Sequence, residues 1–315
     1  MPRLPLSRTT FLRVVLGVAL LAGLASGCAT LEEKERELTF RVVHADAGWY
    51  SGLPESVQEL DLPVSAAPGA QRIHAWWWPD ADPRAPTIFY LHGVRWNLTG
   101  HVQRIEQLRR FGFSVFAIDY RGFGKSDGDL PSEEMVYEDA RAGWAWLTLR
   151  QPDPARRFIY GHSLGGAVAI DLAAWLSTQA PAAGPQARGL IVESTFTSLP
   201  DIAAELSFSW LPTGLIMTQK FDSIDKIRTV AMPVLVVHGA GDRFVPARFS
   251  QALYQAAPGP KKLLLIENGS HNNSMWIGTG EYQRALGELF GLSGRAAGDA
   301  QLSGAGGRVE GSAHF

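Results

Sequence analysis

The sequence predicts an α/β protein with a mostly parallel central sheet of about eight strands and helices on both faces. Short apolar runs alternate with helical patterns from Thr87 to Phe290, as βαβ units require. A tight turn that contains glycine joins one such run to a helix at residues 161–165, and Asp242 and His271 each follow a later run. Because parallel strands end at one edge of a sheet, these three places can meet.

The composition limits the possible classes of function. Apolar residues make up 46% of the 315-residue chain, which is enough for a sizeable core. The 29 basic and 31 acidic residues give a formal charge of −2, which argues against nucleic acid as a partner. The single cysteine, Cys28, excludes a disulfide bond within the chain.

The N-terminus has the pattern of an export signal. Arg3, Arg8 and Arg13 precede an uninterrupted apolar run from Val14 to Ala25, and small residues lead on to Cys28. This run of 12 residues is shorter than a typical transmembrane helix.

The end of this segment resembles a bacterial lipobox. The resemblance implies a signal peptide over residues 1–27, lipidation of Cys28 as the mature N-terminus, and a membrane partner reached through that lipid. Ala29 stands where aspartate would indicate inner-membrane retention, so the resemblance favours the periplasmic side of the outer membrane in a bacterial envelope. An uncleaved anchor and a plain signal peptide ending near Ala29 are the alternatives.

The next residues lead into the sheet. Residues 28–38 include the charged run Leu31 to Leu38 and predict a solvated tether between membrane and domain, with the first short helix of the fold as the alternative. Three runs bounded by turn residues then predict the antiparallel start of the sheet. These runs are Thr39–His44, Val57–Val64 and Arg72–Trp78.

Strands and helices then alternate. The expected strands are Thr87–Leu91, Ser114–Tyr120, Phe158–Tyr160, Gly189–Glu193, Pro233–His238 and Leu263–Glu267. The expected helices are Val102–Phe111, Ser132–Leu149, Ala167–Leu176 and Glu281–Phe290. Residues 194–232 are apolar and predict an insertion of short helices, which either lines an acyl pocket or packs on the sheet edge. Residues 293–315 are rich in Gly, Ala and Ser and predict a disordered tail.

Residues 161–165 read Gly-His-Ser-Leu-Gly and match the G-x-S-x-G pattern of a nucleophile elbow between a strand and a helix. Side chains at positions 161 and 165 would collide with neighbouring backbone in so tight a turn, and glycine avoids this. We expect the Ser163 hydroxyl to be exposed at the start of a helix whose N–H groups stabilise negative charge. An ordinary Gly-rich turn is the alternative.

A serine nucleophile needs a base, and the base needs an orienting acid. Asp242 lies in the loop after the strand that ends at His238, and His271 lies in the loop after the next strand. We expect His271 to take the proton from Ser163 and Asp242 to hold the other ring nitrogen. The order Ser, Asp, His is that of the α/β-hydrolases.

The chain resembles the α/β-hydrolase superfamily from about residue 39 to residue 292. Four motifs match in order, namely Leu91-His92-Gly93, the run Asp119 to Ser126, the elbow, and the run His238 to Pro246. Thr195–Ser198 and Phe221–Ile227 are similar to the small-lid branch, which includes serine-aminopeptidase-like and depalmitoylase-like proteins.

The resemblance implies the α/β-hydrolase fold over residues 39–292, with a small helical lid over residues 194–232. It also implies that the backbone N–H groups of Val94 and Leu164 form the oxyanion hole, and that no cofactor and no metal is needed. Relatives often carry a small or polar residue and more glycine after His-Gly, whereas this chain has Val94 to Asn97. Arg95 then narrows the pocket, meets a carboxylate or, as we favour, is solvated.

Other patterns fit no site. Gly124-Lys125-Ser126 imitates the end of a phosphate-binding loop, but the glycine required five positions earlier is Asp119. His92, His162 and His238 lack the spacing of metal ligands, so we expect them to be hydrogen-bonded loop histidines.

The sequence therefore predicts a serine hydrolase that cleaves carboxylic esters or thioesters through an acyl-enzyme, on a small acyl ester, thioester or lipid-like substrate. A serine aminopeptidase-like peptidase and a non-catalytic envelope lipoprotein are the alternatives. A peptidase would need carboxylates that bind a free amine, and the insertion offers four. These are Asp201, Glu205, Asp222 and Asp225. The apolar bias of the insertion favours the esterase, and no pattern indicates an oligomeric state.

Overall fold

The computed structural model describes residues 29–179, 186–206, 210 and 212–292. The expected signal peptide, Cys28 and the expected tail lie outside the described residues. None of the described helices is long and apolar enough to cross a membrane.

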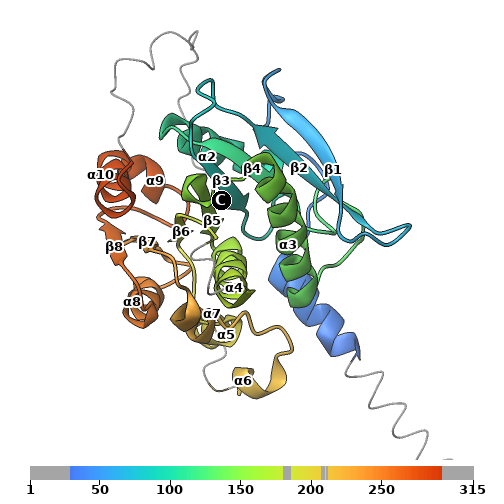
Figure 1. The fold of residues 1–315 in the computed structure, drawn as a ribbon. Helices are drawn as coiled ribbons and strands as arrows, with labels where there is room; N and C mark the ends of the chain where they lie inside the picture. The colour runs from blue at the N-terminus through green and yellow to red at the C-terminus, as the bar shows by residue number, and fades with distance from the viewer. Residues whose placement is uncertain (1–28, 180–185, 207–209, 211, 293–315) are drawn as a thin grey trace, which may run out of the picture.

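One sheet runs through the described part of the chain (Figure 1), and its eight strands follow the order β1-β2-β4-β3-β5-β6-β7-β8. The strands are β1 Gln58–Pro63, β2 Arg72–Trp78, β3 Thr87–Leu91, β4 Ser114–Ile118, β5 Arg157–His162, β6 Gly189–Glu193, β7 Val234–Gly239 and β8 Lys261–Ile266. β2 pairs antiparallel with both β1 and β4, and the other pairs are parallel. The expected mostly parallel sheet is confirmed.

Helices cover both faces. The labelled helices are α2 Leu98–Arg110, α3 Glu133–Arg150, α4 Leu164–Gln179, α5 Leu199–Leu206, α6 Thr213–Ile216, α7 Ser223–Lys226, α8 Ala247–Ala256, α9 Ser274–Ile277 and α10 Thr279–Phe290. Residues 29–40 form a further helix before the sheet. The 194–232 insertion contains α5, α6 and α7, and Figure 1 shows them gathered beyond one end of α4.

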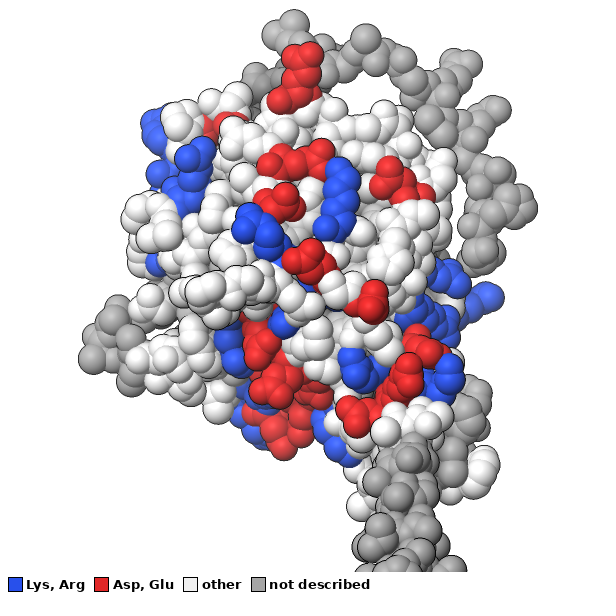
Figure 2. Space-filling model, turned by 90° about the vertical axis from the view of Figure 1, so that its right-hand side faces the viewer, with Lys and Arg blue, Asp and Glu red and all other residues white. Residues whose placement is uncertain are grey.

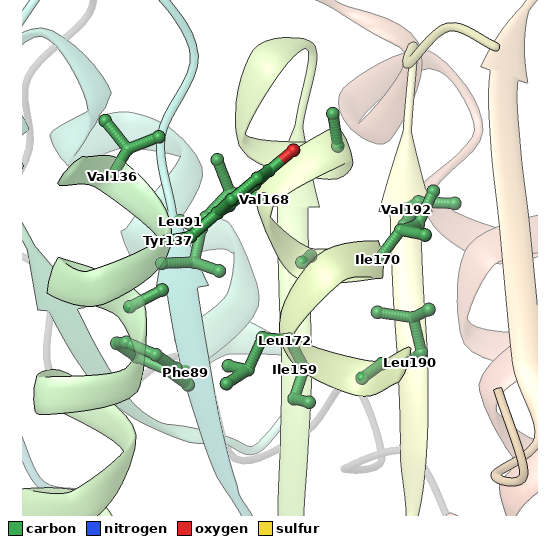
Figure 3. Packing of buried hydrophobic residues seen from close by; sticks show 14 of the residues in the cluster. Phe89, Leu91, Val136, Tyr137, Ile159, Val168, Ile170, Leu172, Leu190 and Val192 are labelled. Carbon is green, nitrogen blue, oxygen red and sulfur yellow. The ribbon is translucent and has the colours of Figure 1, made fainter. Parts of the chain in front are cut away.

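The core lies on both sides of the central strands because their side chains alternate. Ile88 and Tyr90 of β3 pack in the cluster formed with α2 and α10. Phe89 and Leu91 point the other way and pack with residues of α3 and α4 (Figure 3). Burial on both faces explains why these strands read as continuous apolar runs.

One expected strand is wrong. Thr39 and Phe40 end the helix 29–40, and residues 41–44 have no regular structure. Arg41 donates its backbone N–H to Glu37 and has a φ of 47°, which is a left-handed helix end and not extended backbone. The charged run Leu31 to Leu38 is helical, and most of its side chains are exposed.

The surface over β1, β2 and α3 carries both signs of charge. Figure 2 shows acidic and basic side chains interspersed over this face. The ion pairs of this region include Lys125 with Glu59 and Arg121 with Glu138. This mixture is in keeping with the nearly neutral charge of the whole chain.

Candidate active site

The turn between β5 and α4 is as tight as its sequence predicts. A Cβ atom at Gly161 would lie 2.0 Å from the carbonyl oxygen of Gly165, and one at Gly165 would lie 2.1 Å from that of Leu91. Real Cβ atoms do not approach backbone so closely, so only glycine fits at both positions. Ser163 stands between them with a φ of 56°, a conformation that costs energy for a non-glycine residue and recurs at active sites.

Asp242 and His271 are brought together from two adjacent loops. The Nδ1 atom of His271 donates to Oδ2 of Asp242 over 2.7 Å. The other carboxylate oxygen accepts from the backbone N–H groups of Phe244 and Val245, each at 2.9 Å. The aspartate side chain is fully buried, while the imidazole is 13% exposed. This pair leaves Nε2 of His271 as the ring nitrogen available to a substrate or a nucleophile.

The environment keeps the Asp242 carboxyl ionised. Burial alone would raise its pKa, but hydrogen bonds from His238, His271 and the Val245 backbone outweigh burial and hold the pKa well below its ordinary value. The carboxylate therefore orients the His271 ring at neutral pH without taking its proton.

The elbow and the histidine loop touch through His162. Its Nε2 atom donates to the carbonyl oxygen of His271 over 2.9 Å, and the two rings lie 4.9 Å apart. Among the described residues, no hydrogen bond joins the Ser163 hydroxyl to the His271 ring, so that third contact of the triad stays a prediction. In enzymes without substrate such contacts are often long and tighten only on binding.

The expected oxyanion residues flank Ser163. Leu164 is the first residue of α4, and a Cβ atom at Gly93, next to Val94, would lie 3.2 Å from Cβ of Ser163. Arg95 is exposed and forms no ion pair within the described part of the chain, in keeping with a solvated side chain. Its φ of 81° marks the loop after β3 as strained.

A buried ionic network under the site has no sequence motif. Arg104 of α2 pairs with Glu193 at the end of β6 over 2.7 Å, and both side chains are 5% exposed or less. Tyr160 and Ser274 donate to the same carboxylate, each at 2.7 Å. Burial would raise the pKa of Glu193, but Arg104 and these hydrogen bonds outweigh it, so the pKa is lowered.

This network connects the two halves of the site. The backbone oxygen of Glu193 accepts the N–H of Ser163 at 2.9 Å. The guanidinium of Arg104 donates to the backbone oxygen of Asn272, the residue after His271, at 3.0 Å. The sequence offers two weak signals for this network. Arg104 is a charged residue on the inward face of a helix, and Glu193 is a charged residue at the end of an apolar strand.

The remaining histidines at strand ends are hydrogen-bonded, as expected. His92 contacts the carbonyl oxygen of Gly93, and His238 contacts Ser250 and the carbonyl oxygen of Val245. Within the residues that the structure describes, no group of three or more His, Cys, Asp or Glu side chains is arranged to hold a metal ion.

Comparisons with known proteins identify a family and a shared fold. Residues 82–218 match the family model described as "Serine aminopeptidase, S33". The chain is 33% identical over 260 residues to uncharacterized protein MT2364 of Mycobacterium tuberculosis, covering 81% of this chain and 87% of that one. It is 32% identical over 202 residues to the lysophosphatidylserine lipase ABHD12 of Danio rerio, covering 60% of this chain and 51% of the lipase.

Solved structures share the fold at low sequence identity. The Pyrococcus furiosus esterase Pf2001 superposes with a TM-score of 0.61 at 19% identity, covering 81% of this chain and 100% of the esterase. Est1E of Butyrivibrio proteoclasticus, solved with ferulic acid bound, gives a TM-score of 0.57 at 20% identity, covering 74% of this chain and 99% of that one.

Proposed function

We propose that this chain, which belongs to the α/β-hydrolase superfamily, is a serine hydrolase that cleaves carboxylic esters or thioesters through an acyl-enzyme. The observation that carries the proposal is the partly buried Asp242–His271 hydrogen bond. Its loop contacts, through His162, the elbow on which Ser163 has a φ of 56°. Esterases among the structural neighbours, and a lipase among the relatives, support an ester as substrate.

The proposed reaction uses each residue for one task. Ser163 Oγ attacks the acyl carbon while Nε2 of His271 takes the hydroxyl proton, and Asp242 stabilises the imidazolium that forms. The N–H groups of Val94 and Leu164 stabilise the oxyanion. The alcohol or thiol leaves with the proton from His271, and water then hydrolyses the acyl-enzyme by the same steps.

Fluorophosphonate labelling tests this proposal. We expect the probe to label the wild-type protein and the control Ser65→Ala, which changes an exposed serine, but not Ser163→Ala. Ser163→Ala should also lower kcat for a p-nitrophenyl ester by about 10⁶-fold, as triad knockouts do. An unlabelled wild type, or equal labelling of Ser163→Ala, would rule the proposal out.

A peptidase is the second candidate because the family model that matches is named for an aminopeptidase. Two of the four insertion carboxylates already have partners, which disfavours a site for a free amine. Asp201 accepts a hydrogen bond from Thr197, and Glu205 is paired with Arg248. We expect faster turnover of p-nitrophenyl acyl esters than of aminoacyl anilides, and a clear preference for anilides would reverse this ranking.

We also propose that Cys28 is lipidated and tethers the enzyme to the periplasmic side of the outer membrane. The pattern of residues 1–28 supports this. Palmitate labelling should mark the full-length protein and not Cys28→Ala, and globomycin should block its processing. A Cys28 that is neither modified nor at a cleaved N-terminus would defeat this part of the proposal.

A further inference from the structure

The chain between residue 28 and the sheet contacts segments near the carboxyl ends of the strands, the edge of the sheet at which the candidate site lies. We call this edge the catalytic edge. Residues 35–47, which we call the N-terminal clamp, contact the lid insertion at one end and the loop after β3 at the other. No motif in the sequence predicts either contact.

The first end of the clamp is hydrogen-bonded to the 194–232 insertion, which we call the lid. The Glu35 carboxylate accepts three hydrogen bonds of 2.8 Å, two from the backbone N–H and hydroxyl of Thr218 and one from the backbone N–H of Gln219. Arg36 beside it donates to the carbonyl oxygens of residues 130 and 131. Hydrogen bonds to a carboxylate are stronger than neutral ones, so this contact fixes residues 218–219 against the helix 29–40.

The second end of the clamp holds the loop after β3. The carbonyl oxygen of Phe40 accepts the backbone N–H of Arg95 at 3.0 Å. The side-chain amide of Asn97 donates to the carbonyl oxygens of residues 43, 44 and 45 at 3.0 to 3.2 Å. The φ of 81° at Arg95 is costly for an arginine and persists only where surrounding contacts enforce it.

Phe40 joins the two ends. Its ring is fully buried and packs edge to face on Phe221 of the lid insertion, with centroids 6.1 Å apart. Phe221 packs in turn on Tyr137 of α3 at 5.7 Å. One residue therefore contacts the lid through its ring and the loop after β3 through its carbonyl group.

The loop after β3 carries the proposed oxyanion donor, and the peptide of Arg95 follows that of Val94 directly. Oxyanion stabilisation depends on donors held about 3 Å from the developing charge. We propose that the N-terminal clamp positions this loop and the lid together, with Phe40 and Glu35 as positioning residues. This inference rests on the proposed serine hydrolase function.

Kinetics of the full-length protein test the clamp. Phe40→Ala keeps the carbonyl group that binds Arg95 but removes the ring that fixes residue 40 against Phe221. It should lower kcat for p-nitrophenyl butyrate by about 10-fold or more and change KM by less than about twofold, because the oxyanion forms only in the transition state. Glu35→Ala frees the lid and should raise KM for long-chain esters more than for short ones. The matched control Glu33→Ala, an exposed residue of the same helix, should leave both constants within about twofold.

Hydrogen exchange gives a second readout that does not need activity. The Arg95 amide should exchange about 10-fold faster in Phe40→Ala, and the Thr218 and Gln219 amides faster in Glu35→Ala, with no change in Glu33→Ala. Unchanged exchange, or unchanged kinetics in both folded variants, would overturn the clamp. An unlabelled wild type would instead overturn the proposed function, and exchange would still decide whether the clamp holds the loop. Glu35 is only partly buried, so Glu35→Ala keeps the test open should Phe40→Ala not fold.

Discussion

The two sides of the candidate site are held in different ways. One side is the Asp242–His271 pair, and the other is the loop after β3. The Asp242 carboxylate is held mainly within its own loop, where it accepts from two backbone N–H groups within three residues of itself. It also binds the His271 ring, whose loop His162 and Arg104 support from elsewhere in the chain. The loop after β3 is held by Asn97 and by residues 43–45, which lie 52 to 54 positions earlier in the chain. Local motifs mainly specify the first side, and contacts distant in sequence specify the second.

Mutations in three places should therefore have three different effects. Changes on the acid–base side should remove chemistry and leave the fold intact. Changes in the ionic network below it should remove stability, because a buried charge loses its partner. Changes in the N-terminal clamp should lower activity only in part and keep most of the stability. They shift the N–H donors of the proposed oxyanion hole, which are still present.

With the nucleophile left in place, the largest effect is expected at Asp242. Asp242→Asn should lower kcat by about 10⁴-fold, because an amide favours the wrong tautomer of His271. Kinetics with a p-nitrophenyl ester would measure this loss, and circular dichroism would show whether the fold is kept. A loss of less than about 10-fold would mean that His271 does not depend on the aspartate.

The next largest effect is a loss of stability, which we expect from a change at Glu193. Glu193→Gln leaves Arg104 buried beside a neutral amide, which should cost about 3–5 kcal/mol in the free energy of unfolding. Urea denaturation would measure this cost.

The matched control removes both charges. The double variant Arg104→Met, Glu193→Gln should lose clearly less stability than Glu193→Gln, because no unpaired charge stays buried and the amide oxygen still accepts from Tyr160 or Ser274. Equal losses in the single and double variants would show that packing, and not the charge pair, dominates this network.

The smallest expected effect is on the pH dependence of the free energy of unfolding. The pKa of Asp242 is lower in the folded than in the unfolded protein, so its stabilisation is full above the unfolded pKa and is lost as the pH falls towards the folded pKa. Below about pH 4 the wild type should lose up to about 1.4 kcal/mol per pH unit more than Asp242→Asn. Parallel stability curves for the two proteins would contradict the lowered pKa.

Much of the fold follows from the sequence. The bounds of β2, β3 and β6 were predicted to the residue, because strands buried on both faces read as unbroken apolar runs. Gly161 and Gly165 likewise indicated the elbow, since their close contacts tolerate no side chain. In these places the sequence signal lies within a few neighbouring residues, even where the close contact, as that of Gly165 with Leu91, is distant in the chain.

The sequence does not predict features that depend on contacts between residues far apart in the chain. The run Thr39 to His44 has the composition of a strand, but its carbonyl groups bind Asn97 and Arg95 and not a neighbouring strand. Arg104 and Glu193 lie 89 positions apart, and neither has a motif that points to the other. Helix α8 was missed as well, because its short amphipathic pattern follows Asp242 without a side-chain cap.

The helix 29–40 also determines how far the enzyme would stand from a membrane. If Cys28 carries a lipid, the bilayer begins one residue before this helix, and Glu35 grips the lid only seven residues later. Seven helical residues span about 10 Å, less than the thickness of one leaflet. The enzyme would then have no stalk. Under the proposed lipidation of Cys28, the part of the insertion that Glu35 binds would lie within a short length of chain from the lipid.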